Sequence, residues 1–323
     1  MKIQRRTLLL VTVMGASATL LQACGGGDDH DPAPQNIVQI ASANPDFSLL
    51  VSAVVKADLA TTLSGTDLFT VFAPTNAAFN AAATALGLAD GAAMVAALSS
   101  ADLAKVLLYH VAAGRNLAAS LVAGPLPTAY EFEGAPANVT LSLSSGVVIT
   151  DTVLTQATVT SADIVASNGV IHVIDKLLVP PGVLNIVQMA QLNPIFSTLV
   201  GAVVAANLAG TLSAPAPLLT VFAPVNAAFA AIQATVDGLS VPQLTTVLTY
   251  HVLGIQVLAA DIPFATPVGT LATSQTITIN NATPPAIATI SDTTATAANI
   301  VAVNIRASNG VIHVIDKVLI PVI

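Results

Sequence analysis

Charged side chains are scarce in this chain of 323 residues, at 8% of the total, and tryptophan is absent. Nucleic-acid binding draws its affinity from clustered Lys and Arg. Nine basic against seventeen acidic side chains therefore exclude nucleic acid as an expected partner. Long apolar runs are also missing: beyond the N-terminus no uninterrupted run reaches the roughly 18 residues that a membrane-spanning helix needs. We expect a soluble or tethered protein, not a polytopic one.

Cysteine occurs once, at Cys24, so an intramolecular disulfide is excluded. Before it, a basic segment and an apolar segment form the pattern of an export signal. The stretch Leu21-Gln22-Ala23-Cys24 resembles a bacterial lipobox. We expect residues 1–23 to be a cleaved signal peptide, Cys24 to be lipidated, and residues 24–35 to be a flexible tether, because their Gly- and Asp-rich composition cannot bury apolar surface. An ordinary secretory signal with a free cysteine is the alternative.

The chain repeats itself once over most of its length. The segment Thr-Val-Phe-Ala-Pro occurs at 70–74 and again at 220–224, and the eleven residues 166–176 return unchanged at 307–317. The offset between the copies is 150 at the first segment and 141 at the second. Two homologous domains with small loop differences are therefore predicted.

We place these domains at residues 36–180 and 183–321. Between them lies Pro180-Pro181-Gly182, where two prolines prevent helix continuation and stiffen the connection. The short linker predicts a restricted relative orientation.

Each domain is predicted to place helices before strands. The first half has apolar residues at helical spacing, and the second half is rich in Thr, Val and Ile, which favour strands. Capping-box spacing marks helix starts at Ser99 with Asp102 and at Ser240 with Gln243. Asn168-Gly169 and Asn309-Gly310, between apolar runs, predict two-residue hairpin turns. This pattern is typical of an α+β fold.

The order of three motifs resembles the fasciclin domain. Both copies carry Thr-Val-Phe-Ala-Pro-x-Asn-x-x-Phe, then Tyr-His, then Asn-Gly-Val-Ile-His-Val-Ile-Asp. The resemblance implies two tandem domains, each a wedge-shaped β-sheet flanked by several helices. It also implies an extracellular or envelope location and roles in adhesion and in binding proteins or glycans. It implies neither catalysis nor a cofactor.

Four of the five histidines fall at repeat positions. Two of them, His172 and His313, lie among Val and Ile, so we expect structural core positions there. A metal site normally needs three or four ligands, and we predict none. Asp175 and Asp316 follow these histidines by three residues, hence on the opposite face of a strand. That geometry argues against a His-Asp catalytic pair, no Gly-x-Ser-x-Gly elbow is present, and we predict that the protein is not an enzyme.

The two Tyr-His pairs are the candidate partner-binding residues: Tyr109, His110, Tyr250 and His251. Each histidine shares the apolar stripe of its helix, and its tyrosine lies about 100° further around. Tyrosine is favoured at interfaces because it offers a large apolar face and a polar tip. The alternative is that the ring packs under a neighbouring segment of its own domain.

The sequence thus predicts a non-enzymatic adhesion or interaction protein, lipid-anchored to the bacterial envelope in the periplasm or at the cell surface. Its expected partner is an envelope or extracellular protein or glycan. The alternative function is a periplasmic carrier that holds a small apolar ligand or lipid between helices and sheet.

Overall fold

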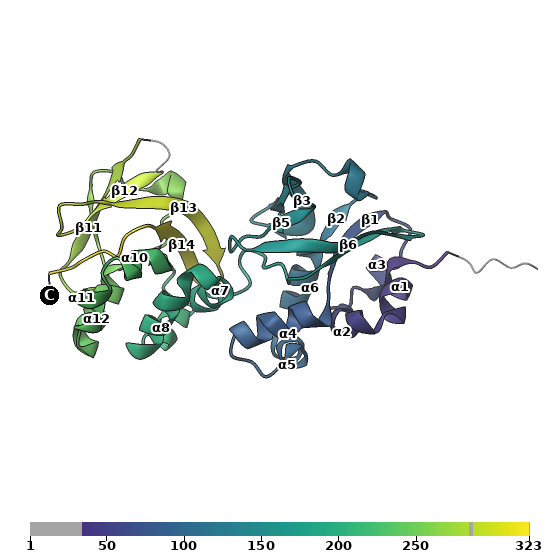
Figure 1. Ribbon diagram of the computed structural model, residues 1–323, viewed down its shortest axis with the longest axis horizontal. Helices are drawn as coiled ribbons and strands as arrows, with labels where there is room; N and C mark the ends of the chain where they lie inside the picture. The colour runs from purple at the N-terminus through teal and green to yellow at the C-terminus, as the bar shows by residue number, and fades with distance from the viewer. Residues whose placement is uncertain (1–33, 284–286, 323) are drawn as a thin grey trace, which may run out of the picture. The chain divides into compact units, whose positions relative to one another are not determined.

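The structure is a computed structural model that describes residues 34–283 and 287–322 (Figure 1). The predicted signal peptide, Cys24 and nearly all of the tether fall on residues 1–33, outside the described residues.

The first domain begins with its helices and ends with most of its strands (Figure 1). Its elements are α1 Ile37–Ala43, η1 Pro45–Phe47, α2 Ser48–Lys56, α3 Ala60–Leu63, β1 Phe69–Pro74, α4 Asn76–Ala85, α5 Gly91–Ala97, α6 Ser100–Tyr109, β2 Val111–Ala113, η2 Ala118–Ser120, β3 Gly124–Phe132, β4 Ala135–Ser142, β5 Val148–Thr150, β6 Gln156–Ala166 and β7 Gly169–Ile174. The strands form one seven-stranded sheet in the order β2-β1-β7-β6-β5-β4-β3.

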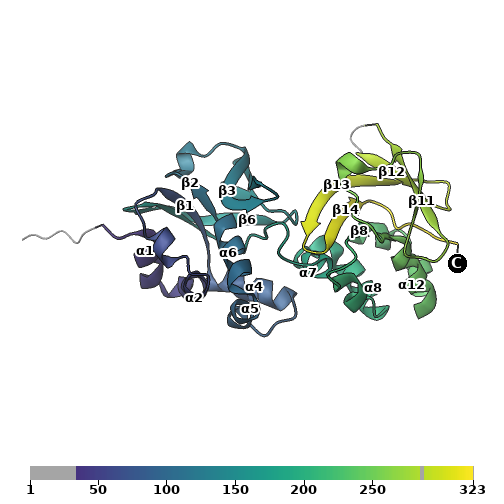
Figure 2. The ribbon, with the colours of Figure 1, turned by 180° about the vertical axis from the view of Figure 1, so that it is seen from behind.

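The second domain repeats this plan (Figure 2). Its elements are α7 Ile186–Leu192, η3 Pro194–Phe196, α8 Ser197–Ala205, α9 Ala209–Ser213, β8 Leu219–Pro224, α10 Asn226–Ala230, α11 Gln233–Asp237, α12 Val241–Tyr250, β9 Val252–Leu253, η4 Ala259–Asp261, β10 Pro267–Gly269, β11 Thr276–Asn281, β12 Ala288–Ser291, β13 Ala298–Ala307 and β14 Gly310–Ile315. Its sheet order, β10-β11-β12-β13-β14-β8-β9, is that of the first domain read from the other edge. The α+β class is therefore confirmed.

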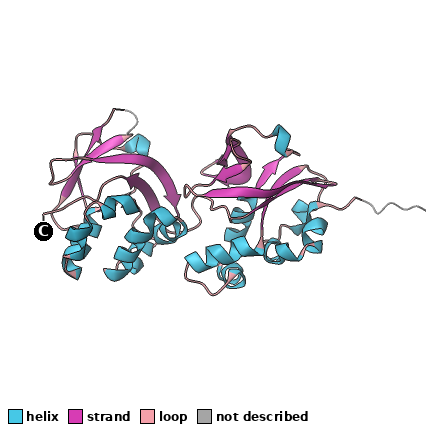
Figure 3. Ribbon diagram, in the orientation of Figure 1, coloured by secondary structure: helices cyan, strands magenta, loops and turns pink. Residues whose placement is uncertain are grey.

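In each sheet only the strand that carries Phe-Ala-Pro pairs in parallel, with the strand that carries Ile-His-Val-Ile. Phe72 lies opposite His172, and Phe222 lies opposite His313. The other pairings are antiparallel. Most helices gather along one face of each sheet (Figure 3). In the first domain the edge strands β2 and β3 also contact each other, so the sheet is nearly closed.

The predicted helix starts are confirmed by their caps. The Ser99 hydroxyl accepts a hydrogen bond from the Asp102 amide at 3.0 Å at the start of α6. Ser240 and Gln243 form a capping box at the start of α12. Such caps satisfy amides that have no partner within the helix. The sequence alone therefore located both helices that end at the Tyr-His pairs.

The predicted hairpin turns are present but begin one residue earlier than expected. Ala166 pairs with Gly169, so the two-residue loop is Ser167 and Asn168, and Gly169 already belongs to β7. A Cβ on Gly169 would lie 2.0 Å from the Phe69 carbonyl oxygen, and its φ is +154°. Glycine is required here because the neighbouring strand approaches too closely for any side chain.

Each domain has two apolar cores, one on each side of its sheet. In the first domain, the helices and the sheet enclose one cluster that includes Phe47, Leu103 and Ile171. The curled sheet encloses the other, which includes Phe72, Tyr109 and Ile149. The second domain has the corresponding pair of clusters. The helix that ends at the Tyr-His pair therefore has core on two of its sides.

The main difference between the copies is a shortened helix and connection, so it extends beyond the small loop differences that the sequence predicts. Thirty positions separate Phe79 from Tyr109, but only twenty-one separate Phe229 from Tyr250. At the offset of 141, α11 aligns with residues 92–96 of α5, so the nine missing residues fall between Asn80 and α5, where the first domain has the second half of α4 and the loop after it. The repeat offset reported the length of this change but not its structural nature.

Within the described residues, no individual helix has the length and apolar character needed to cross a membrane; three strongly bent helix pairs meet those two criteria when each pair is taken together.

Candidate functional site

The Tyr-His pairs lie in the interior of both domains, so a partner cannot reach them in this fold and the prediction that they bind a partner is wrong. Tyr109, His110, Tyr250 and His251 have exposed fractions of 0%, 1%, 2% and 2%. The Tyr109 hydroxyl donates to the Asn138 carbonyl at 2.9 Å, and the Tyr250 hydroxyl donates to the Thr276 carbonyl at 3.0 Å. The physical reason is that the curled sheet covers the face of the helix that carries the tyrosine, a face that the apolar stripe in the sequence does not include. The alternative, that each tyrosine ring packs under a segment of its own domain, is confirmed.

Both ring nitrogens of His110 and His251 are hydrogen-bonded. His110 Nδ1 lies 2.7 Å from the Val106 carbonyl, and its Nε2 accepts from the Leu178 amide at 2.9 Å. His251 makes the same two bonds with Val247 and Leu319. One nitrogen therefore donates and the other accepts, which is the neutral imidazole.

Burial explains why these two rings stay neutral. It lowers the pKa of His110 to about 4 and that of His251 to about 4, because desolvation penalises the charged form. Each ring ties the end of its helix to the segment that follows the last strand of its domain. They act as structural ties between elements distant in sequence.

The strand histidines are buried as predicted, each with an exposed fraction of 0%. His172 Nδ1 accepts from the Asp163 amide at 3.2 Å, and its Nε2 lies 2.9 Å from the Asn116 carbonyl. His313 bonds correspondingly to the Asn304 amide and the Val257 carbonyl. Each ring also stacks on the phenylalanine opposite it in the parallel pair, with centroids 5.6 Å apart.

The repeated turn residues carry a network that the turn prediction alone did not include. The Asn168 side chain accepts from the Ile37 amide at 2.9 Å and donates to the Leu63 carbonyl at 2.8 Å. Asn309 does the same with Ile186 and Leu212. The hairpin thus anchors the first helix of each domain. In the sequence, the signal that could have revealed this network was the repetition of the Asn-Gly pair at the same offset as its neighbours.

The aspartates that follow the strand histidines bind backbone amides. Asp175 accepts from the Thr158 amide at 2.7 Å, and Asp316 accepts from the Asn299 amide at 2.7 Å. The structure therefore pairs each aspartate with a neighbouring strand, and the His-Asp pair is not assembled.

A second pair of repeated aspartates was not identified from the sequence. Asp151 accepts from the Val179 amide at 3.1 Å, and its counterpart Asp292 accepts from the Ile320 amide at 2.8 Å and from Lys317 Nζ at 2.8 Å. Burial raises the pKa of Asp151. Burial also acts to raise the pKa of Asp292, but its hydrogen bonds with Lys317 and Thr294 outweigh that effect and lower it. In the sequence, the signal that could have identified Asp151 and Asp292 as a pair was their separation by 141 residues, the offset of the repeat.

Cavities offer little room for a small molecule inside a domain. In the second domain an apolar cavity lies between α7, α8, β8 and α12, lined among others by Val187, Leu199 and Leu248, with a free volume of about 30 Å³. A cavity of this size holds at most a few water molecules. Among residues 34–283 and 287–322, no group of three or more His, Cys, Asp or Glu side chains could hold a metal ion.

The repeated polar residues of the described chain therefore serve the fold. Their rings and carboxylates bond to backbone atoms, which leaves no nucleophile paired with a base among these residues.

A family model and several known proteins match this chain. The fasciclin domain family model matches residues 45–180 and 194–321. Protein sll1483 of Synechocystis sp. is 41% identical over 145 residues, which are 45% of this chain and 73% of that protein. The uncharacterized protein sll1735 of the same organism is 39% identical over 143 residues, 44% of this chain and 96% of that protein.

More distant similarities extend to animal proteins. Periostin of Homo sapiens is 30% identical over 224 residues, which are 69% of this chain but only 24% of periostin. The solved FAS1 domain pair of the insect cell adhesion molecule fasciclin I aligns over 87% of this chain and 95% of that chain, at 17% identity and a TM-score of 0.43. The family match covers most of the chain and falls once on each repeat, so this chain belongs to the fasciclin family, with two tandem fasciclin domains.

Proposed function

We propose that this chain is a non-enzymatic interaction protein of the bacterial envelope, which binds a protein or glycan partner through the surfaces of its tandem fasciclin domains. One observation carries the proposal: the histidines and tyrosines that both fasciclin domains repeat are buried and hydrogen-bonded to backbone atoms in both. A family member with two such domains, and with its repeated polar groups committed to the fold, is suited to binding rather than to chemistry.

Two linked domains strengthen binding in a way that one cannot. If each domain contributes a weak contact, the second contact forms at the high effective concentration set by the short linker. Affinity for a multivalent partner then exceeds that of either domain.

The binding proposal is tested with the chain from residue 25 onward, applied to a glycan array and used in pull-downs from envelope extracts. A reproducible partner that binds saturably to the purified chain supports the proposal. Turnover of a substrate by the purified chain, abolished by a point substitution that leaves the fold intact, would contradict it.

We also propose that Cys24 is lipidated and anchors the body to a membrane. Its support is the lipobox-like segment and the lack of any other cysteine in the sequence. We expect the unaltered protein to fractionate with membranes and Cys24→Ser to become soluble. A wild-type protein that is already wholly soluble would refute the anchor, without bearing on partner binding.

A further inference from the structure

Lys317 of the second domain is held by oxygen atoms of its own domain. Its Nζ donates to Asp292 Oδ2 at 2.8 Å, to Thr294 Oγ1 at 2.5 Å and to the Thr296 carbonyl at 2.6 Å. A lysine ammonium group has three protons to donate. The fold therefore satisfies this cation completely.

Lys176 is the repeat counterpart of Lys317, but its ammonium group is not held in this way. Within residues 34–283 and 287–322 its Nζ makes no hydrogen bond or ion pair, and only the more distant charges of Asp151 and Asp175 act on it. Asp151 stands where the second domain has Asp292, and its two oxygens accept backbone amides instead. The cation of the first domain is therefore available to another molecule.

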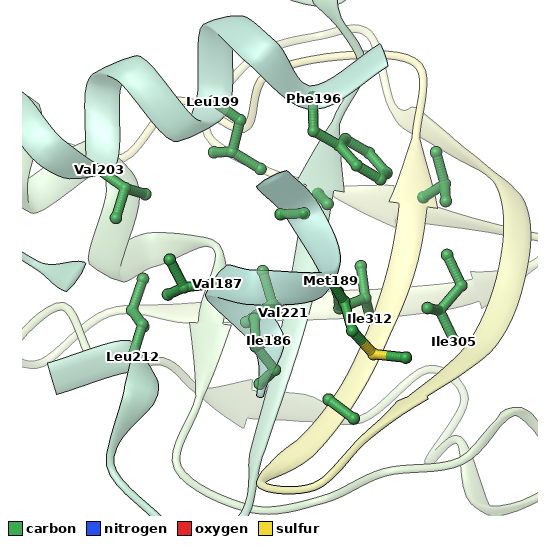
Figure 4. Close-up of a cluster of buried hydrophobic side chains, with 14 of the residues drawn as sticks. Ile186, Val187, Met189, Phe196, Leu199, Val203, Leu212, Val221, Ile305 and Ile312 are labelled. Carbon is green, nitrogen blue, oxygen red and sulfur yellow. The ribbon is translucent and has the colours of Figure 1, made fainter. Parts of the chain in front are cut away.

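The contact between the domains explains this difference. Val153 stands where the second domain has Thr294, and it is 1% exposed because it joins the apolar core of the second domain. Figure 4 shows Met189 and Ile305 directed into that core. The Val153 carbonyl also accepts a hydrogen bond from Asn193 Nδ2 at 2.7 Å. The turn after β5 is thus bonded to the second domain and not to the lysine.

Lys176 lines an open groove with a free volume of about 670 Å³. The other walls of the groove are formed by α4, the turn after β5, the end of β7 and the corner between α7 and η3. Sites for small molecules have volumes of about 300 to 1,000 Å³. We call this space, lined by Lys176 together with residues 78–85, 154–156 and 192–195, the junction groove.

Most of the wall of the junction groove is apolar. Helix α4 contributes four alanines, which share one face of the helix because three or four positions separate them: Ala78, Ala81, Ala82 and Ala85. Leu154 and Ile195 also line the groove, and they are 42% and 39% exposed. Covering apolar side chains that contact water is favourable. The groove therefore favours a ligand with an apolar part.

The charges around Lys176 select the polar part of the ligand. Burial lowers the pKa of Lys176, while Asp151 and Asp175 act to raise it. Because its ammonium group is partly desolvated, a charge-assisted hydrogen bond to it is strong. The two nearby carboxylates repel a ligand with several negative charges, such as a phosphate group. A single carboxylate fits best, because it supplies oxygen atoms of the kind that Lys317 finds in its own domain.

We propose that the junction groove binds a small amphipathic carboxylic acid, with the carboxylate on Lys176 Nζ and an unbranched apolar chain along the alanine face of α4. From Ala78 to Ala85 this face rises by about 10 Å, which suits an acyl chain of about eight to ten carbon atoms. The site requires both domains, since Leu154 and Ile195 lie in different ones. It adds a small-molecule ligand to the protein or glycan partner proposed above.

The test is isothermal titration calorimetry of the chain from residue 25 onward with decanoate. We expect saturable binding of one decanoate per chain. Lys176→Met removes the cation but keeps an apolar stem, and should weaken binding by about tenfold or more, as expected for a lost hydrogen bond to a charged group. Lys105→Met is the matched control, because it makes the same change of charge at a lysine of α6 outside the groove; it should leave binding unchanged.

A stability measurement separates ligand binding from a structural role. Lys176→Met loses no hydrogen bond within the described residues, so it should unfold in urea like the wild type. Lys317→Met loses three hydrogen bonds and should unfold at a lower urea concentration. If Lys176→Met is destabilised as strongly as Lys317→Met, the lysine serves the fold and the proposal is overturned.

A second variant tests the apolar wall. Ala81→Trp, at an exposed position of α4, fills the groove and should abolish decanoate binding. Ala92→Trp is its control on α5, also exposed but outside the groove, and should bind like the wild type. Equal affinities of these two variants for decanoate would contradict the proposed location.

Other ligands give outcomes of their own. Decanol that binds as tightly as decanoate shows that the carboxylate is not recognised, and acetate that binds as tightly shows that the apolar chain is not. An apolar tetrapeptide with a free C-terminus that binds more tightly than decanoate assigns the groove to the chain end of a protein partner. Each of these results, like a lack of decanoate binding by the wild type, overturns the proposal. The proposed function is judged separately, because a partner from the glycan array or the pull-downs that still binds Ala81→Trp supports it whatever decanoate does.

Discussion

His172 and His313 show how a histidine in an apolar strand is made compatible with burial. In each ring Nδ1 accepts a hydrogen bond from a backbone amide and Nε2 donates one to a backbone carbonyl. The ring also stacks on a phenylalanine of the neighbouring strand. Because both nitrogens are satisfied, the ring can be buried without the penalty of an unpaired polar group.

We predict that His172→Ala and His313→Ala each destabilise the protein by about 2 to 4 kcal/mol, through a cavity and two stranded backbone partners. Denaturant unfolding of each variant measures the change. Val55→Ala, at an exposed position, is the control and should unfold like the wild type. Unchanged unfolding of both histidine variants, together with loss of partner binding, would assign these residues to function instead.

At the level of elements, His110 and His251 join a helix to the segment after the last strand. Each histidine accepts a hydrogen bond from the amide of a leucine, Leu178 or Leu319, and the sequence separation between the two residues is the same in both domains. The shared contact explains why the histidine recurs. The same level holds the main difference between the domains, which is that α10 is five residues shorter than α4 and is followed by a shorter connection.

These two histidines predict an acid-sensitive fold. Since their folded pKa of about 4 lies below the ordinary 6.5, the unfolded chain binds more protons between these values. Stability is then constant above about pH 6.5 and falls as the pH drops towards 4, by about 2 kcal/mol per histidine at pH 5.

The measurement is the free energy of unfolding from urea titrations at several pH values. The double variant His110→Gln, His251→Gln should be less stable at pH 7 but should lose most of this pH dependence. A slope identical to that of the wild type would show that other groups cause it.

At the scale of the whole molecule, the described residues of both fasciclin domains belong to one compact unit that begins at residue 34. Arg306 of β13 pairs with Glu133 and lies over the Phe132 ring at 5.3 Å from its centroid. Its carbonyl accepts from the amide of Gly182 in the linker at 3.0 Å. The second domain thus contacts both the linker and the β3–β4 turn of the first.

We predict that Arg306→Ala makes the linker more accessible, because it removes an ion pair and a cation–π contact at once. Limited proteolysis should cut near residues 180–185 severalfold faster than in the wild type. Arg115→Ala is the matched control, since Arg115 donates only to carbonyls of the first domain in the described chain. Equal cleavage rates for the two variants would contradict the prediction.

The sequence by itself determined the repeat, the α+β class, the capped helices before the Tyr-His pairs and the burial of the strand histidines. These features depend on local chemistry. A capping residue lies three residues from its partner, and a side chain flanked by Val and Ile on a buried strand is itself buried. Family membership followed from the motif order because those motifs preserve local contacts in both copies.

Only the tertiary structure decided where Tyr109 and Tyr250 point and what the difference in repeat offset means. A helical stripe identifies the face that meets one core, but the curled sheet brings a second core to the other side of the same helix, and that layer comes from residues far along the chain. The offset likewise measured nine missing residues. Only the structure shows that they come from the end of α4 and the loop after it, while α11 keeps Val236 packed against the core.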